Sequence, residues 1–184
     1  MTAKHDPGKD LQAVLGTSPR NPAPLGVTIK TKIERGDAYA APEIYDIVIT
    51  LLEIVRGEEA LQRVKEAGVM AEPPPNGFEY FLVRLTFGYS RRGRGIGEEP
   101  YQLRSGQFAA VSADGETVYK NPVTARQPQP PLIGEVFQPG ESREGWIVLQ
   151  VPQEESKPLL IFNREFVEGV YGLWGHVWFQ LSEA

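Results

Sequence analysis

The sequence predicts an all-β protein, an antiparallel β-sandwich with one short crossover helix at about residues 57–68. Apolar and polar residues alternate with a period of two in several segments, which is typical of strands that bury one face. Glycine, proline and Asp-Gly pairs separate these segments at short intervals. A single segment shows the wider apolar spacing of a helix. Many short strands with this punctuation indicate a sandwich rather than an alternating α/β fold.

Three strands are expected in the first half of the chain. Val27–Glu34 alternates and predicts a half-buried strand. Ile44–Val55 is apolar on both faces, as expected for a central strand that is covered on both sides. Phe78–Tyr89 has the clearest alternation, with an apolar residue at every odd position from Phe81 onward.

The crossover helix is expected between the second and third of these strands. Glu58 and Glu59 would lie in its first turn, where acidic side chains suit the positive end of the helix dipole. Its apolar stripe comprises Ala60, Leu61, Val64 and Ala67. Gly68 is placed to end it as the residue after the C-cap. A helix of about three turns is too short to be stable alone, so we expect it to pack on one end of the sandwich.

The second half of the chain predicts further short strands. They are Leu103–Ser112, Thr117–Lys120, Glu141–Val151, Pro158–Asn163 and Leu173–Leu181. Asp114-Gly115 predicts a hairpin turn between the first two, and Pro152 stops the third. An open sandwich must also protect its sheet edges, and we expect the proline-rich segment Gln127–Pro131 to serve that end.

Composition narrows the class of protein. The chain has 184 residues, 41% of them hydrophobic, which is enough for one domain with its own core. Its net charge of -5 is mild and gives no drive toward nucleic acid. The absence of cysteine removes disulfides, thiolate nucleophiles and cysteine-ligated metals. No apolar stretch approaches the roughly 20 residues of a membrane span.

The domain organisation expected from the sequence is a tail followed by one domain. Residues 1–24 have the proline, glycine, serine and threonine content of a flexible linker, and residues 25–184 would form the sandwich. The first 24 residues lack the apolar core of a signal peptide, so a cytoplasmic location stays open alongside an extracellular one.

An ordered set of short motifs adds a resemblance to a family. The matching pieces are Asn21–Gly26, Arg56–Ala60, Pro75–Val83, Gly106–Phe108, Asp114-Gly115, Pro139–Ser142, Gly145–Pro152 and Trp178–Leu181. Together they resemble a bacterial family of domains of unknown function with a telokin-like, immunoglobulin-like fold. The resemblance implies a β-sandwich common in secreted proteins and surface lipoproteins, and therefore an extracellular or cell-surface location. It implies no catalytic residues and no cofactor.

Two sets of residues are candidate binding sites. On the last strand, Trp174, His176, Trp178 and Gln180 share the face opposite the core. Such an aromatic strip can stack on sugar rings or anchor a protein, although cross-strand packing against tyrosine or arginine neighbours, or cover from the N-terminal segment, would also explain it. In a glycine-rich loop, Arg91, Arg92 and Arg94 could contact an anionic partner. That loop is not followed by the helix that a phosphate-binding loop requires.

Catalysis is not expected. The two histidines, His5 and His176, do not suggest a metal pair, and no nucleophile motif or converging pair of carboxylates is present. The leading hypothesis is a non-catalytic immunoglobulin-like domain of a bacterial extracellular or cell-envelope protein that binds an unknown protein or polymer partner. The alternative is a carbohydrate-binding module that uses the aromatic strip. Homodimerisation through a sheet edge is left open.

Overall fold

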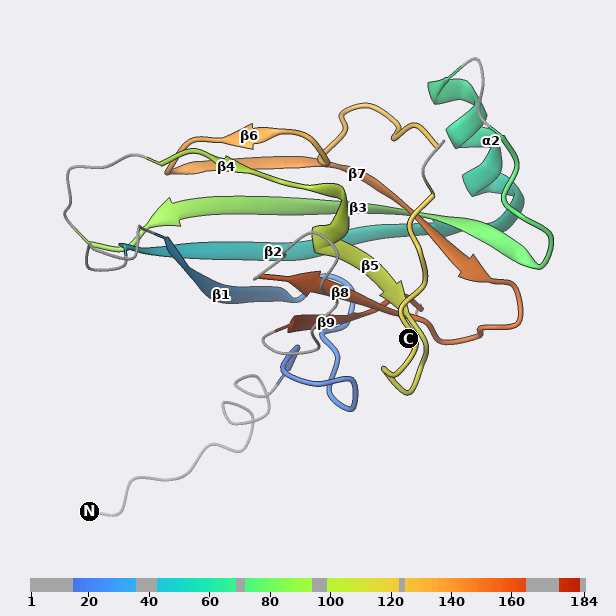
Figure 1. The fold of residues 1–184 in the computed structure, drawn as a ribbon, viewed down its shortest axis with the longest axis horizontal. Coiled ribbons are helices and arrows are strands. Elements are labelled where there is room, and N and C mark those ends of the chain that lie inside the picture. Colours follow the sequence, from blue (N-terminus) through green and yellow to red (C-terminus); the bar gives the residue numbers. More distant parts are fainter. Residues whose placement is uncertain are drawn as a thin grey trace.

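The computed structural model describes residues 15–35, 43–68, 72–93, 99–122, 125–164 and 176–182. These residues form antiparallel sheets that pack on one another, with the α-helix α2 (Gly57–Ala67) at one end (Figure 1). The predicted all-β sandwich with one short helix is therefore confirmed. Among the described residues, no helix has both the length and the apolar character needed to cross a membrane.

The larger sheet contains the three long strands predicted in the first half of the chain. Its strands are β1 (Thr28–Arg35), β2 (Glu43–Arg56), β3 (Phe78–Arg91) and β7 (Glu141–Pro152), in the order β1-β2-β3-β7. Each neighbouring pair is antiparallel, and β2 and β3 share a register shift between Leu51 and Glu53. This shift returns the side chain of Glu53 to the outer face of the sheet, where it meets the helix.

The smaller sheet consists of β5 (Phe108–Val111), β8 (Leu159–Asn163) and β9 (His176–Gln180). Two short strands that the sequence did not predict, β4 (Tyr101–Gln102) and β6 (Val136–Phe137), pair with each other. The prediction of a strand over Leu103–Ser112 is only partly right. The 3-10 helix η1 (Ser105–Gln107) replaces its first half, because the buried Gln107 side chain accepts the Arg104 N–H at 2.8 Å and bends the chain.

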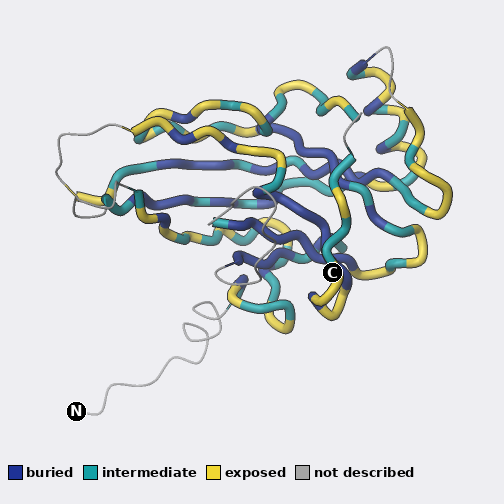
Figure 2. The backbone as a smooth tube through the Cα atoms, viewed as in Figure 1, coloured by how far each residue is buried: buried dark blue, intermediate teal, exposed yellow. Residues whose placement is uncertain are grey.

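The core lies between the two sheets. Phe87 of β3 is at its centre, with the rings of Tyr101, Phe108, Phe137 and Phe162 at centroid distances of 4.9–6.5 Å. Figure 2 shows the buried residues along the middle of β2, β3 and β7 and through β8 and β9, with exposed residues in the turns and on the outer strands such as β1. Aromatic pairs of this kind add about 0.5–1.5 kcal/mol each to the stabilisation from burial alone.

The helix packs on the outer face of the larger sheet, as a separate apolar cluster. Ala60 and Val64 are fully buried there against Val55, Leu82 and Val148. Gly68 does end the helix, but not with the left-handed backbone that was expected, since its φ is -159°. A Cβ at this position would lie 2.7 Å from Cδ of the Arg126 side chain, so the close approach of that side chain favours glycine here.

The described part of the expected linker, residues 15–24, packs against the sandwich. The Ala23 N–H donates to the Trp178 carbonyl at 2.8 Å, and the Trp178 N–H donates to the Gly16 carbonyl at 2.9 Å. Ala23 is fully buried in the core. The domain therefore extends N-terminal to residue 25, because β9 needs hydrogen-bond partners along its outer edge. Residues 1–14 lie outside the described residues.

Candidate functional site

A pocket of about 180 Å³ opens beside the free edge of β7, where the two sheets come together. Its apolar lining consists of Phe108, Pro122, Ala125, Ile133, Ile147, Val148 and Leu149. Its polar side chains are Ser105, Asn121 and Gln127, none of which titrates near neutral pH. The pocket therefore suits a neutral, mainly apolar group.

Two side-chain amides hold the walls of the pocket in place. Asn121 Nδ2 donates to the carbonyl oxygens of Ser105 and Phe108, both at 2.7 Å. Gln127 Oε1 accepts the N–H groups of Ile133 at 2.9 Å and Leu132 at 3.2 Å. Because each amide bonds backbone groups of a different segment, the irregular chain around the pocket has a defined shape rather than depending on apolar contact alone.

The edge of β7 forms one wall, and the chain itself covers part of it. The Trp146 N–H donates to the Pro130 carbonyl at 2.9 Å, and the Leu132 N–H donates to the Trp146 carbonyl at 3.1 Å. Pro131 and Trp146 thereby form a parallel bridge. The expected protection of a sheet edge by Gln127–Pro131 is confirmed at this residue of β7.

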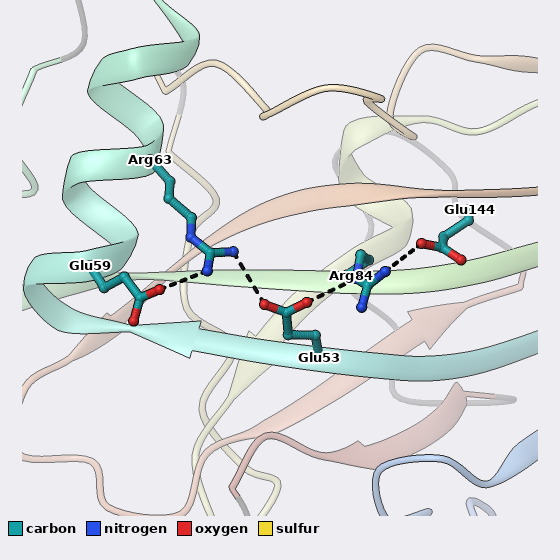
Figure 3. Close-up of polar contacts among 5 residues, drawn as sticks. All are labelled: Glu53, Glu59, Arg63, Arg84 and Glu144. Carbon is teal, nitrogen blue, oxygen red and sulfur yellow. Dashed lines mark hydrogen bonds and ion pairs between the residues drawn. The ribbon is translucent and has the colours of Figure 1, made fainter.

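Charged side chains on the outer face of the larger sheet form a chain of ion pairs (Figure 3), and two of its arginines lie over the Trp146 ring. The guanidinium groups of Arg63 and Arg84 lie 5.4 and 5.9 Å from its ring centroid. Glu53 links the two arginines, with Oε1 3.2 Å from Arg63 and Oε2 2.9 Å from Arg84. Glu59 of the helix and Glu144 of β7 complete the chain of ion pairs at 2.6 Å each. This network joins α2, β2, β3 and β7 beside the pocket.

The residues predicted for the aromatic strip do not form an exposed surface in the described part of the chain. His176 and Trp178 are 8% and 5% exposed, and Gln180 is half-buried. Trp178 lies under the Asp114-Gly115 turn, since a Cβ at Gly115 would be 3.3 Å from Cη2 of the indole and 2.6 Å from Cβ of Pro19. Its side chain packs in an apolar cluster with Ala109, Val111, Leu159 and Ile161 of neighbouring strands, and its backbone hydrogen-bonds to Gly16 and Ala23 of the N-terminal segment. Trp174 lies outside the described residues.

The predicted arginine set is divided between the two faces of the larger sheet. Arg91 forms an ion pair with Glu43, whereas Arg92, the next residue along the chain, pairs with Asp46 at 2.6 Å. Neighbours on a strand point to opposite faces, so these two guanidinium groups cannot bind one anion as a pair. Arg94 lies outside the described residues, and the anionic-partner role of this set stays a prediction.

Lys30 of β1 joins Arg92 on the outer face, with Nζ 2.9 Å from Asp46. Burial alone would raise the pKa of the Asp46 carboxyl, but the hydrogen bonds and charges of Lys30 and Arg92 outweigh it and hold that pKa below its usual value. Sequence reasoning missed this pairing because Lys30 lies two strands away from Arg92, and only the register of β1 on β2 brings it close.

Sequence reasoning also missed the pocket. Its walls come from η1, β5, β7 and two irregular segments, so no single stretch of sequence carries the pattern. One signal was present in the sequence, the proline-rich segment Gln127–Pro131, which was predicted to protect a sheet edge. This segment does lie on β7, but nothing in its sequence indicates the pocket next to it. Among the described residues, no three acidic or histidine side chains lie close enough to hold a metal ion.

Comparison with known proteins assigns neither a family nor a function to the chain. No protein-family model and no curated protein matches the chain. The chain is similar to the solved structure of MPT63, a secreted protein from Mycobacterium tuberculosis, with 14% identity and a TM-score of 0.42 over 72% of this chain and 84% of that one. A likeness of this size carries no argument about function. The family resemblance drawn from the motifs stays a prediction.

Proposed function

We propose that this protein is a non-catalytic binding domain of a bacterial extracellular or cell-envelope protein, and that the pocket beside β7 receives one side chain of a partner protein. The lining of the pocket carries the proposal, since it combines seven apolar residues with three neutral polar ones. The described lining has no acidic or basic side chain, so the Ser105 hydroxyl has no general base there to activate it, and the pocket suits recognition rather than proton transfer or covalent chemistry. The location follows the family resemblance.

The volume of the pocket favours a side chain over a whole small-molecule ligand. Sites for drug-sized ligands and cofactors have volumes of about 300–1,000 Å³. At about 180 Å³ the pocket is smaller, and it is close to the cavity of about 150 Å³ that accepts a benzene ring. One leucine, methionine or phenylalanine side chain would therefore fill it.

The proposal is tested by titrating N-acetyl-leucine amide and N-acetyl-phenylalanine amide into ¹⁵N-labelled protein. We expect amide shift changes centred on Phe108, Ile147 and Leu149. Ser105→Leu, which fills the pocket from its rim, should abolish them. Ser156→Leu makes the same change in an exposed turn away from the pocket and should leave them unchanged. Shift changes centred elsewhere, or none in the wild type, would refute the pocket as the binding site.

A further inference from the structure

The larger and the smaller sheet have four outer edges, and three of these have a partner or a guard among the described residues. The edge of β9 is covered by residues 16–23 through the hydrogen bonds of Gly16 and Ala23. The edge of β5 is covered by the return from the Asp-Gly turn, since the Tyr119 N–H donates to the Ala110 carbonyl at 2.8 Å. On β1, Arg164 donates to the Lys32 carbonyl at 3.4 Å, and charged side chains on an edge oppose pairing.

The β7 edge differs because its cover stops after Trp146. In an antiparallel ladder, alternate residues direct both N–H and C=O to the same neighbouring strand. Trp146 directs its groups away from β3, toward Pro130 and Leu132. The register of β3 on β7 runs without a shift, so Val148 and Gln150 also point away from β3. No described residue forms a backbone hydrogen bond with either of them.

The open stretch has defined ends. Pro130–Leu132 closes it at Trp146, and at the other end Pro152 has no N–H while its carbonyl accepts the Glu155 N–H at 3.0 Å. Within the part of the chain that the structure describes, four backbone groups of this stretch have no backbone partner, the N–H and C=O of Val148 and Gln150. Val148 is only 8% exposed and lines the pocket. Buried backbone groups are almost always paired, so groups that no described residue pairs beside a cavity suit an added strand.

We infer that an extended segment of the partner protein adds to β7 as a short strand at Val148–Gln150 and places one apolar side chain in the pocket. This rests on the proposed function and names the form of the partner. Strand addition supplies affinity through main-chain hydrogen bonds and selectivity through a pocket for a side chain. The open stretch of three residues spans about 10 Å, so a segment of three to four residues is sufficient.

The chain already makes this contact with itself. Pro130–Leu132 binds Trp146 on the same edge through one donated and one accepted backbone hydrogen bond. The partner segment would continue the same edge past this internal one, toward Pro152. The neutral lining selects against a charged side chain at the position that enters the pocket.

The experiment compares Gln150→Pro with Gln150→Ala. Proline removes only the N–H that points away from β3, so the ladder with β3 is preserved, whereas alanine retains the N–H. The probes are capped pentapeptides of the form Thr-Thr-X-Thr-Thr, with X as leucine, phenylalanine or aspartate. We expect the leucine or phenylalanine peptide to bind wild type and Gln150→Ala with a Kd of about 1 mM or tighter. Gln150→Pro should weaken binding at least about tenfold.

Three outcomes are decisive. Shift changes and slowed hydrogen exchange at the Val148 and Gln150 amides on peptide binding support strand addition. Equal affinity for Gln150→Pro and Gln150→Ala, with single amino-acid amides still entering the pocket, overturns strand addition but leaves the proposed function standing. No binding of either peptides or single amides overturns both. A circular dichroism melt of each variant shows whether the fold is retained.

Discussion

Gly145→Ala should release the chain segment that covers the β7 edge. A Cβ at Gly145 would lie 2.6 Å from the Pro130 carbonyl oxygen and 2.8 Å from Cγ of Leu132. Neither contact can be relieved by rotating a flexible side-chain end, because one atom is backbone and the other is the branch point of a buried leucine. Pro130–Leu132 must therefore move away from β7.

The expected cost follows from the hydrogen bonds at Trp146. A retreat of about 0.8 Å brings the Cβ to an ordinary contact distance of about 3.4 Å and stretches the 2.9 Å bond from Trp146 N–H to roughly 3.7 Å, beyond the outer limit of a hydrogen bond. Losing two such bonds costs about 2 kcal/mol. The lower entropy of the unfolded alanine chain offsets about 0.5–1 kcal/mol of that cost. The free energy of unfolding should fall by about 1–1.5 kcal/mol, and Tm by about 3–6 °C.

Gly88→Ala is the matched control for this change. Gly88 lies on β3 of the same sheet, and neither glycine has a positive φ. A methyl group at Gly88 would meet Ser142 and Val48 at 3.5–3.6 Å, which is ordinary contact. Differential scanning calorimetry should show Gly88→Ala unchanged or slightly more stable. If Gly145→Ala has the same Tm as Gly88→Ala, and its Trp146 amide stays protected from exchange, then the contact of Pro130–Leu132 with Trp146 does not contribute the expected stability.

Other predictions concern the charges and the tryptophans. Glu53→Gln breaks the ion pairs to Arg63 and Arg84, whose side chains are partly exposed. Urea unfolding should show a free energy of unfolding lower by about 0.5–1 kcal/mol, and this difference should shrink in about 1 M NaCl. A difference independent of salt would contradict the ionic origin. The Asp46 carboxyl has a lowered pKa in the folded state, so it stabilises the fold fully above its unfolded pKa of about 3.9, and this stabilisation is lost as pH falls through the folded value. The difference in the free energy of unfolding between wild type and Asp46→Asn should therefore vanish in acid. A difference that stays constant with pH would refute this. In a Trp174→Phe variant the two remaining tryptophans are buried, so acrylamide should quench fluorescence weakly, and strong quenching would revive the aromatic strip as a binding surface.

Sequence periodicity predicted β1, β3 and β7 because apolar and polar residues alternate along each, and β2 was predicted from its nearly continuous apolar run. β1, β2, β3 and β7 each lie within two residues of their predicted bounds. The helix and the Asp-Gly turn were also predicted, since both depend on local residue chemistry. The same reasoning failed for β4 and β6, because two-residue strands have no period to detect.

The candidate site was less accessible to sequence reasoning, for two physical reasons. The partners of Arg91 and Arg92 are set by register between strands, which also placed Lys30 beside Asp46. Trp178 is buried in an apolar cluster of side chains from neighbouring strands, and its backbone hydrogen-bonds to Gly16 and Ala23, whose segment has the composition of a linker. Composition reports the flexibility of a free chain and does not report hydrogen bonds that the chain forms on docking.

Hydrogen exchange along β7 in the unbound protein tests the open edge most directly. Trp146, Ile147 and Leu149 donate to backbone partners, and their amides should exchange slowly. The amides of Val148 and Gln150 should exchange at least about tenfold faster than those neighbours, giving an alternating pattern from residue 147 to residue 150. Uniformly slow exchange across these residues would show that the edge is already paired, and would contradict the proposed site of strand addition.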